Sequence, residues 1–369
     1  MSFVLSFWLS PLVILSIAKD IGAGVPSFKF YFLAFSFKLV LHVRLGYNAI
    51  HMQVRKISRL HPVFWSLLIL ILAQGLALAV ISREDPYLAT KNLALPPSPP
   101  ETVVLWPQNV TGPSGEVVQV QAYSSFLPVL IYFLVAVIAI GSLLFFIPVS
   151  KLMLVLRLVF TLLFAWGAFM MFLFWFPFWA TLTVAGAVGI AWFFVRRVWL
   201  HDLAMLLSMA ALGAVFGRLI SPWTTMLIVA AIAVYDFLAV RFGYMVWMTE
   251  KLSESDNLPA FIIPHSLRGW GANLSQNKVK ELVETKPSER TESVLGGGDI
   301  GFAVLITCSV YASRSLSSAL IMAVFTLLGL AGAYVIQAVF LQGKAMPALP
   351  PIAAFSIIGL LITAGLPRF

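Results

Sequence analysis

Two carboxylates stand in stretches of this chain that are otherwise apolar enough to lie inside a lipid bilayer. Asp236 follows Tyr235 in the run Val-Tyr-Asp-Phe, and Asp299 follows three glycines at positions 296–298. An ionised carboxylate in hydrocarbon costs several kcal/mol, so intramembrane acids are functional candidates. Because there are two of them, we expect a pair that shares a proton.

The chemistry open to such a pair follows from its surroundings. Two carboxylates in a medium of low dielectric constant cannot both ionise cheaply, so the pair is expected to hold one proton near neutral pH. The ionised member can take a proton from water while the protonated member polarises a carbonyl, which is the chemistry of aspartic proteases. A proton relay in an ion- or proton-coupled transporter or channel would use the same pair. Spacing and location alone leave these two hypotheses nearly even.

The composition places the whole chain in a membrane. It is 60% hydrophobic and 11% charged, with a mean hydropathy of +0.96, whereas soluble domains carry about 25% charged residues. The net charge of +9 reflects membrane topology, and no aromatic-basic motif indicates a nucleic-acid partner. The five histidines lack ligand spacing, so we expect neither a metal nor a cofactor. The single cysteine, Cys308, lies in an apolar run and is expected to be a core residue.

Apolar runs of about 20 residues predict an all-α polytopic membrane protein with nine transmembrane helices. The expected spans are 62–81, 125–147, 152–174, 177–195, 200–220, 222–248, 296–313, 315–341 and 347–366. They form a six-helix part over 52–248, with an extracytoplasmic loop at 82–124, and a three-helix part over 296–369. The connection at 249–295 is polar, and neither long loop shows a repeat or a folded-domain pattern. Asp202, at a helix start, is expected to be an interfacial acid.

The first 51 residues fit this pattern poorly, because their apolar segments are short and interrupted by charges. Met52 is followed by a basic segment and a clean span, so we hypothesise that translation begins there and that 1–51 is an N-terminal extension upstream of the true start. With residues 52–61 cytoplasmic, thirteen Lys and Arg lie inside and five outside. This orientation makes loop 249–295 cytoplasmic and puts the C-terminus outside.

The depths of the two acids pose a difficulty. Asp236 lies 12 residues before Met248, roughly 18 Å along a helix, whereas Asp299 lies close to the start of its span. The two meet only if the sixth helix ends before residue 248 or the seventh begins in a water-filled cavity.

Three motifs in order resemble the presenilin/signal-peptide-peptidase family of intramembrane aspartyl proteases, which carry a GxGD motif. They are Tyr235-Asp236 on the sixth span, Gly296-Gly297-Gly298-Asp299 on the seventh, and Pro347-Ala348-Leu349 at the start of the ninth. The resemblance covers about residues 55–369 and implies a nine-helix presenilin-like bundle. The orientation and the Pro-Ala-Leu-Pro sequence look more like the presenilin branch.

The resemblance implies that Asp236 and Asp299 are the catalytic pair of an endopeptidase that cuts transmembrane segments of other proteins. Tyr235, Gly296 and Gly298 would be motif residues, with Gly297 at the variable position. Pro347, Ala348 and Leu349 would shape the site. A substrate helix must unwind before cleavage, and we expect its extended stretch to pair as an added strand near the Gly-rich or Pro-Ala-Leu segment.

The resemblance also favours proteolysis over the transporter, and over a third alternative, a catalytically silent membrane chaperone. The compact length suggests a microbial homologue in a prokaryotic cell membrane that works without accessory subunits. The natural substrate, the cleavage position and the oligomeric state are outside the reach of the sequence.

Overall fold

Nine helices make up most of the described part of the chain, as the hydropathy pattern predicts. The computed structural model describes residues 60–90, 103, 105–107, 109–111, 117–119, 125–244, 247–248, 258–264, 267–274, 292–340 and 346–365, so the N-terminal extension lies outside the described residues. The helices are α4 (Leu60–Thr90), α5 (Phe126–Phe146), α6 (Val149–Phe172), α7 (Phe178–Phe194), α8 (Val198–Leu219), α9 (Pro222–Arg241), α12 (Gly297–Ser313), α13 (Leu316–Val339) and α14 (Leu349–Ala364). Six are long and apolar enough to cross a membrane, and α7, α12 and α14 are shorter apolar helices. The chain is therefore an integral membrane protein.

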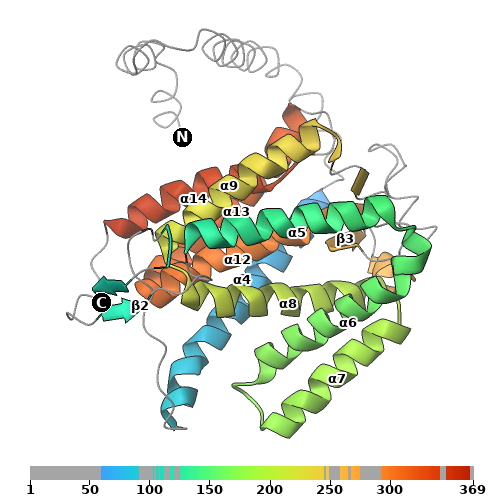
Figure 1. The fold of residues 1–369 in the computed structure, drawn as a ribbon, viewed down its shortest axis with the longest axis horizontal. Helices are drawn as coiled ribbons and strands as arrows, with labels where there is room; N and C mark the ends of the chain where they lie inside the picture. The colour runs from blue at the N-terminus through green and yellow to red at the C-terminus, as the bar shows by residue number, and fades with distance from the viewer. Residues whose placement is uncertain are drawn as a thin grey trace. The chain divides into compact units, whose positions relative to one another are not determined.

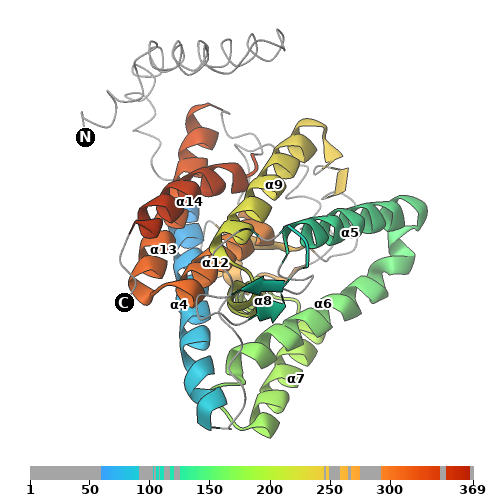
Figure 2. The same ribbon diagram turned by 60° about the vertical axis from the view of Figure 1, so that its left-hand side comes forward.

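The helices differ strongly in how much of their surface the others cover. α12 packs against α4, α8, α9, α13 and α14, and in Figures 1 and 2 it lies among them. The apolar window of α8 is 67% buried, whereas that of α5 is only 6% buried. α6 and α7 lie side by side at the edge of the bundle (Figure 2). The acid-bearing α12 and its neighbour α8 thus form the rigid centre, and α5 lies at the margin.

Small residues allow the central helices to approach closely, as is common where lipid supplies no hydrophobic drive for association. A Cβ atom at Gly217 of α8 would lie 2.5 Å from the Cβ of Cys308 on α12. A Cβ atom at Gly329 of α13 would lie 2.6 Å from the Cα of Ile352 on α14. Cys308 is fully buried, which confirms it as a core residue.

A polar contact also joins three helices inside the apolar core. The amide nitrogen of Gln74 on α4 donates to the hydroxyls of Thr307 on α12, at 3.2 Å, and Thr326 on α13, at 2.6 Å. Each threonine in turn donates to a carbonyl of its own helix. All three polar groups are buried and satisfied, so the contact fixes how α4, α12 and α13 face one another.

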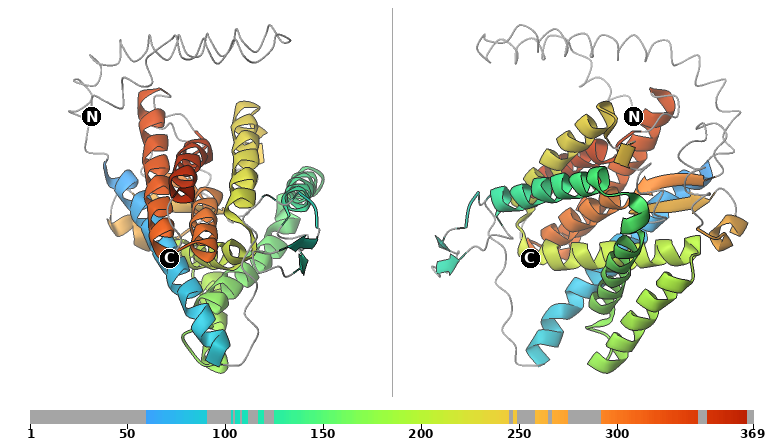
Figure 3. Two further views of the ribbon diagram at one scale, coloured as in Figure 1. Left: turned by 90° about the vertical axis from the view of Figure 1, so that its left-hand side faces the viewer. Right: turned by 45° about the vertical axis from the view of Figure 1, so that its right-hand side comes forward.

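Both long loops contain short strands that the sequence reading missed. Strands β1 (Asn109–Thr111) and β2 (Val117–Gln119) pair in the first loop. Strands β3 (Ala260–Pro264) and β4 (Glu292–Gly296) pair in antiparallel register, and they lie at the end of the bundle where α4 and α8 begin (Figure 3). The Pro-rich stretch at 95–100 and most of 249–295 lie outside the described residues.

The sixth helix is shorter than predicted, and its end explains the depth difficulty. α9 ends at Arg241 rather than at residue 248, because Gly243 takes a φ of 76°, the left-handed conformation that commonly ends a helix. Asp236 is then five residues from the helix end, roughly 7.5 Å. Asp299 is in the first turn of α12. The end of α9 and the start of α12 therefore bring the acids to similar depth.

Candidate active site

Asp236 projects from the last third of α9 and is half-buried. The Tyr235 ring beside it packs edge-on against Phe133 of α5, with 5.6 Å between ring centroids. α9 thus presents its acid to the interior while the neighbouring tyrosine faces α5.

Asp299 reaches the same region from a direct junction between a strand and a helix. β4 ends at Gly296 and α12 begins at the next residue, Gly297. A Cβ atom at Gly296 would lie 2.9 Å from Oδ2 of Asp299, so glycine leaves room for the carboxylate. The carboxylate of Asp299 is close enough to that of Asp236 to interact with it electrostatically.

The other two glycines of the motif lie in different surroundings. Gly297 is buried, and a Cβ atom there would lie 3.1 Å from the carbonyl oxygen of Pro259 and 2.5 Å from Cε of Met205. Gly298 is exposed, and a Cβ atom there would meet nothing closer than Phe302 at 3.8 Å. The sequence reading passed over Gly297 as a variable position, yet the backbone approaches most closely there.

The Pro-Ala-Leu segment comes from the start of α14 and touches one of the acids. The backbone N–H of Leu349 donates a hydrogen bond to the carboxylate of Asp299. Ala348 and Leu349 are buried, and Pro347 is half-buried. Three segments far apart in sequence therefore converge on two carboxylates.

A tyrosine that the sequence reading missed lies on a further side of Asp299. Tyr334 of α13 interacts electrostatically with Asp299, and its hydroxyl is hydrogen-bonded to Ser66 of α4. Ser66 donates its own proton to the carbonyl of Pro62 at 2.9 Å, so the Tyr334 hydroxyl is the donor to Ser66. Neither residue stood out in the sequence, because a single Tyr or Ser on an apolar helix is ordinary.

Two hollows adjoin the site. A cavity of about 510 Å³ is bounded by α5, α6, α8, α9 and α12, and the backbone of Gly297 and Gly298 forms part of its wall. Nearly all of its lining is apolar, including Phe133, Phe164 and Phe302.

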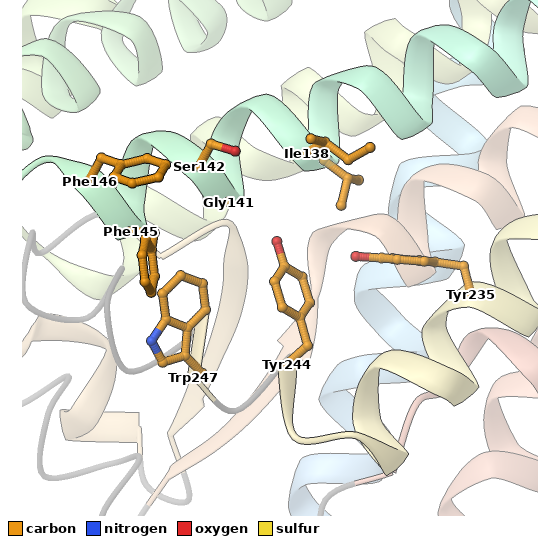
Figure 4. Close-up of a pocket in the computed structure, with 9 residues that line it drawn as sticks. Ile138, Gly141, Ser142, Phe145, Phe146, Tyr235, Tyr244 and Trp247 are labelled. Carbon is orange, nitrogen blue, oxygen red and sulfur yellow. The ribbon is translucent and has the colours of Figure 1, made fainter.

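The second hollow, of about 700 Å³, lies between the ends of α5 and α9 (Figure 4). Tyr235, Tyr244 and Trp247 line it from one side, opposite α5. The Tyr244 hydroxyl points at α5, where a Cβ atom on Gly141 would lie 2.6 Å from it. This hollow thus has largely apolar and aromatic walls, and Tyr235, the neighbour of Asp236, is part of its lining.

Asp202 does not lie at an exposed interface as expected. It is only 5% exposed, and its Oδ1 accepts a hydrogen bond of 3.0 Å from the backbone N–H of Ile262 in β3. Over the described ranges, no group of three or more His, Cys, Asp and Glu side chains could hold a metal ion.

Comparisons with known proteins bear on the family and the fold of the chain. The family described as signal-peptide peptidase, presenilin aspartyl protease matches residues 108–368, which is more than half of the chain. A structure described as a presenilin family intramembrane aspartate protease in C222 space group is 17% identical and covers 83% of this chain and 100% of that chain, with a TM-score of 0.51. A structure of such a protease in P2 space group is 18% identical and covers 82% of this chain and 96% of that chain, with a TM-score of 0.47. No curated protein matches.

At such low identity the first structural likeness shows a common fold alone, and the match over 108–368 carries the relationship. The chain belongs to the signal-peptide peptidase and presenilin family of aspartyl proteases.

Proposed function

We propose that Asp236 and Asp299 are the catalytic pair with which this intramembrane aspartyl protease hydrolyses peptide bonds in transmembrane segments. The observation that carries the proposal is the convergence of α9, the β4–α12 junction and the start of α14 on these two acids. They interact electrostatically, and the N–H of Leu349 restrains the orientation of the Asp299 carboxylate. Tyr235, Gly296, Gly298, Pro347 and Ala348 would shape the site around them.

The reaction needs only the pair, one shared proton and a water molecule. The ionised carboxylate takes a proton from water as the water oxygen attacks the scissile carbonyl carbon, and the protonated carboxyl gives its proton to the carbonyl oxygen. The proton now on the first carboxyl then passes to the amide nitrogen. The C–N bond breaks, one hydroxyl of the intermediate returns its proton to the pair, and a carboxylic acid and an amine are released.

The cavity beside the site suits an apolar substrate segment. Its walls are almost wholly apolar, and the exposed Gly298 leaves its backbone open toward it. An unwound substrate stretch must find partners for its N–H and C=O groups, because the bilayer offers none. A free strand edge near Asp299 would provide such partners.

Only one edge of the β3–β4 sheet suits this purpose. The carbonyl of Ala260 and the N–H of Ile262, which point to the same side of β3, are bound by side chains of α8. The alternate residues of β3 therefore face β4, and on β4 the groups of Val294 and Gly296 point away from β3. Val294 is 42% exposed, so a substrate strand would add along β4, directly before Asp299.

The charge distribution and the origin of the site segments support a proposal for the sidedness and autonomy of the enzyme. Most Lys and Arg residues fall in the segments that the helix order puts on one side, which supports a cytoplasmic loop 249–295 and an external C-terminus. We propose that the protein works in a prokaryotic cell membrane and, because all three site segments come from one chain, without accessory subunits. Cysteines introduced as Ser275→Cys and Ser98→Cys would test the sidedness. A membrane-impermeant maleimide added to intact cells should label only the second, while the buried Cys308 gives little background.

The central experiment compares the enzyme with Asp236→Asn and Asp299→Asn variants in detergent. The probe is a single-span reporter whose transmembrane segment has about 20 Leu, Ala and Gly residues, and products are weighed by mass spectrometry. Each variant should lose activity on the order of a hundredfold or more while its melting temperature stays at or above that of the wild type. Cleavage that survives either substitution would refute the shared pair. Asp-dependent ion flux in liposomes without cleavage would refute proteolysis.

A further inference from the structure

Two consecutive residues at the start of α8 bind the edge of β3 that faces away from β4. The Nε2 atom of His201 lies 3.0 Å from the carbonyl oxygen of Ala260, and Oδ1 of Asp202 accepts from the N–H of Ile262 at 3.0 Å. Ala260 and Ile262 are two residues apart, so their backbone groups lie on the same edge of the strand. The two side chains therefore take the place of a third strand.

The hydrogen bonds of His201 fix its tautomer. The indole N–H of Trp192 points at Nδ1 of His201 from 3.3 Å. An indole nitrogen can only donate, so Nδ1 accepts and the ring hydrogen sits on Nε2. Nε2 then donates to the carbonyl of Ala260. His201 is 3% exposed, and Phe164 packs edge-on against it with 5.8 Å between the ring centroids, so the donor is locked in place.

Backbone contacts connect β3 to Asp299 of α12 over a few residues. Ala260 is the register partner of Gly296, and the N–H of Gly297 donates to the carbonyl of Pro259 at 3.1 Å. Asp299 follows two residues later. Because α8 is the most buried of the six described helices long enough to cross a membrane, it gives the sheet a fixed reference.

We propose that His201 and Asp202 are positioning residues that set the depth and register of the β3–β4 sheet against Asp299. They thereby determine which peptide bond of a bound substrate strand meets the acids. The inference rests on the proposed function, since it needs a substrate that pairs with β4. His201 and Asp202 would thus influence where the substrate is cut through the position of β3 and β4, without touching the substrate themselves.

The test uses three variants of the full-length enzyme. Asp202→Ala removes the acceptor for Ile262. Asp202→Asn keeps an acceptor oxygen and removes the acidic group that faces Glu292 of β4. Glu84→Ala is the matched control, because Glu84 of α4 binds Arg218 at the opposite end of α8, 3.6 Å away.

Two measurements distinguish an effect on the position of the sheet from a general loss of protein stability. Amide hydrogen exchange of 260–264 and 292–297 should speed up on the order of tenfold to a hundredfold in Asp202→Ala, because the buried N–H of Ile262 is left without its acceptor. Mass spectrometry of the reporter products should show a changed ratio between neighbouring cleavage sites. Asp202→Asn should restore both. Glu84→Ala should lower the melting temperature and leave the ratio unchanged.

A loss of folded enzyme lowers every product by the same factor, so an Asp202→Ala product ratio equal to that of the wild type would overturn the proposal. Unchanged exchange in Asp202→Ala would overturn it too. A wild type that cleaves nothing would refute the proposed function and the choice of cleavage site with it, while the exchange result would still report whether α8 holds the sheet.

Discussion

Gly329 on α13 offers a direct test of whether the Pro-Ala-Leu segment must be held against Asp299. In Gly329→Ala the new methyl would lie 2.6 Å from the Cα of Ile352, and ordinary contacts begin at 3.4 Å, so α14 must retreat by about 0.8 Å. Ile352 is one helical turn past Leu349. A rigid α14 would therefore carry the Leu349 N–H away from the Asp299 carboxylate by a similar distance.

The expected effects on stability and on rate differ in size. Overpacking costs about 1–3 kcal/mol, and alanine returns about 1 kcal/mol of helix propensity, so the net destabilisation should be modest, about 0–2 kcal/mol. A misplacement near 1 Å in a catalytic site can cost on the order of a hundredfold in rate. We expect cleavage of the single-span reporter per folded molecule to fall much more than the melting temperature suggests.

Gly332→Ala is the matched control on the same helix. A Cβ atom there would meet only Cε2 of Phe355, at 3.4 Å, which is ordinary contact. This variant should cleave the reporter like the wild type and unfold at the same or a higher temperature. If Gly329→Ala is fully active, or if both variants are equally impaired, the seating of α14 against α13 does not govern the site.

Three further predictions concern stability, read as melting temperature in detergent. Gly217→Ala would place a methyl 2.5 Å from Cβ of Cys308; overpacking of about 1–3 kcal/mol, less about 1 kcal/mol of helix propensity, should cost about 0–2 kcal/mol net without altering the ratio of reporter products. A melting temperature above that of the wild type would show that the α8–α12 contact can relax. Gln74→Leu removes the amide that links two threonines and should cost about 1 kcal/mol, so a gain in stability would contradict the role given to this contact. Ser356→Ala deletes a buried hydroxyl that has no hydrogen-bond partner in the described part of the chain and should stabilise by about 1 kcal/mol; a lower melting temperature would reveal a missed partner.

Hydropathy was enough to predict the helices, because a chain that crosses a bilayer must satisfy its backbone hydrogen bonds internally and long apolar runs do so as helices. The two acids could be found for the same reason, since a carboxylate in an apolar run needs an explanation. The end of α9 was wrong by seven residues, although Gly243 signalled it. In an apolar run a glycine can equally lie inside a helix at a contact with another helix. Only the φ of 76° shows that Gly243 ends the helix instead.

The strands and their supports were beyond the reach of a sequence pattern. β3 and β4 have five residues each and are 27 residues apart along a polar loop. The apolar triplet Phe261-Ile262-Ile263 was the one local signal. His201 and Asp202 bind main-chain groups 59 and 60 residues away, and main-chain partners leave no mark in the sequence.

The junction at Gly296 and Gly297, where a strand becomes a helix with no residue between, has a thermodynamic consequence. A ligand that pairs with β4 and a ligand that occupies the two acids act on one continuous piece of backbone. Their binding free energies should therefore be linked, and the linkage must be reciprocal. An extended peptide on β4 should tighten the binding of a transition-state analogue by the same factor by which the analogue tightens the peptide. Substrates that pair poorly should then lose turnover as well as affinity, because binding energy is what aligns the acid.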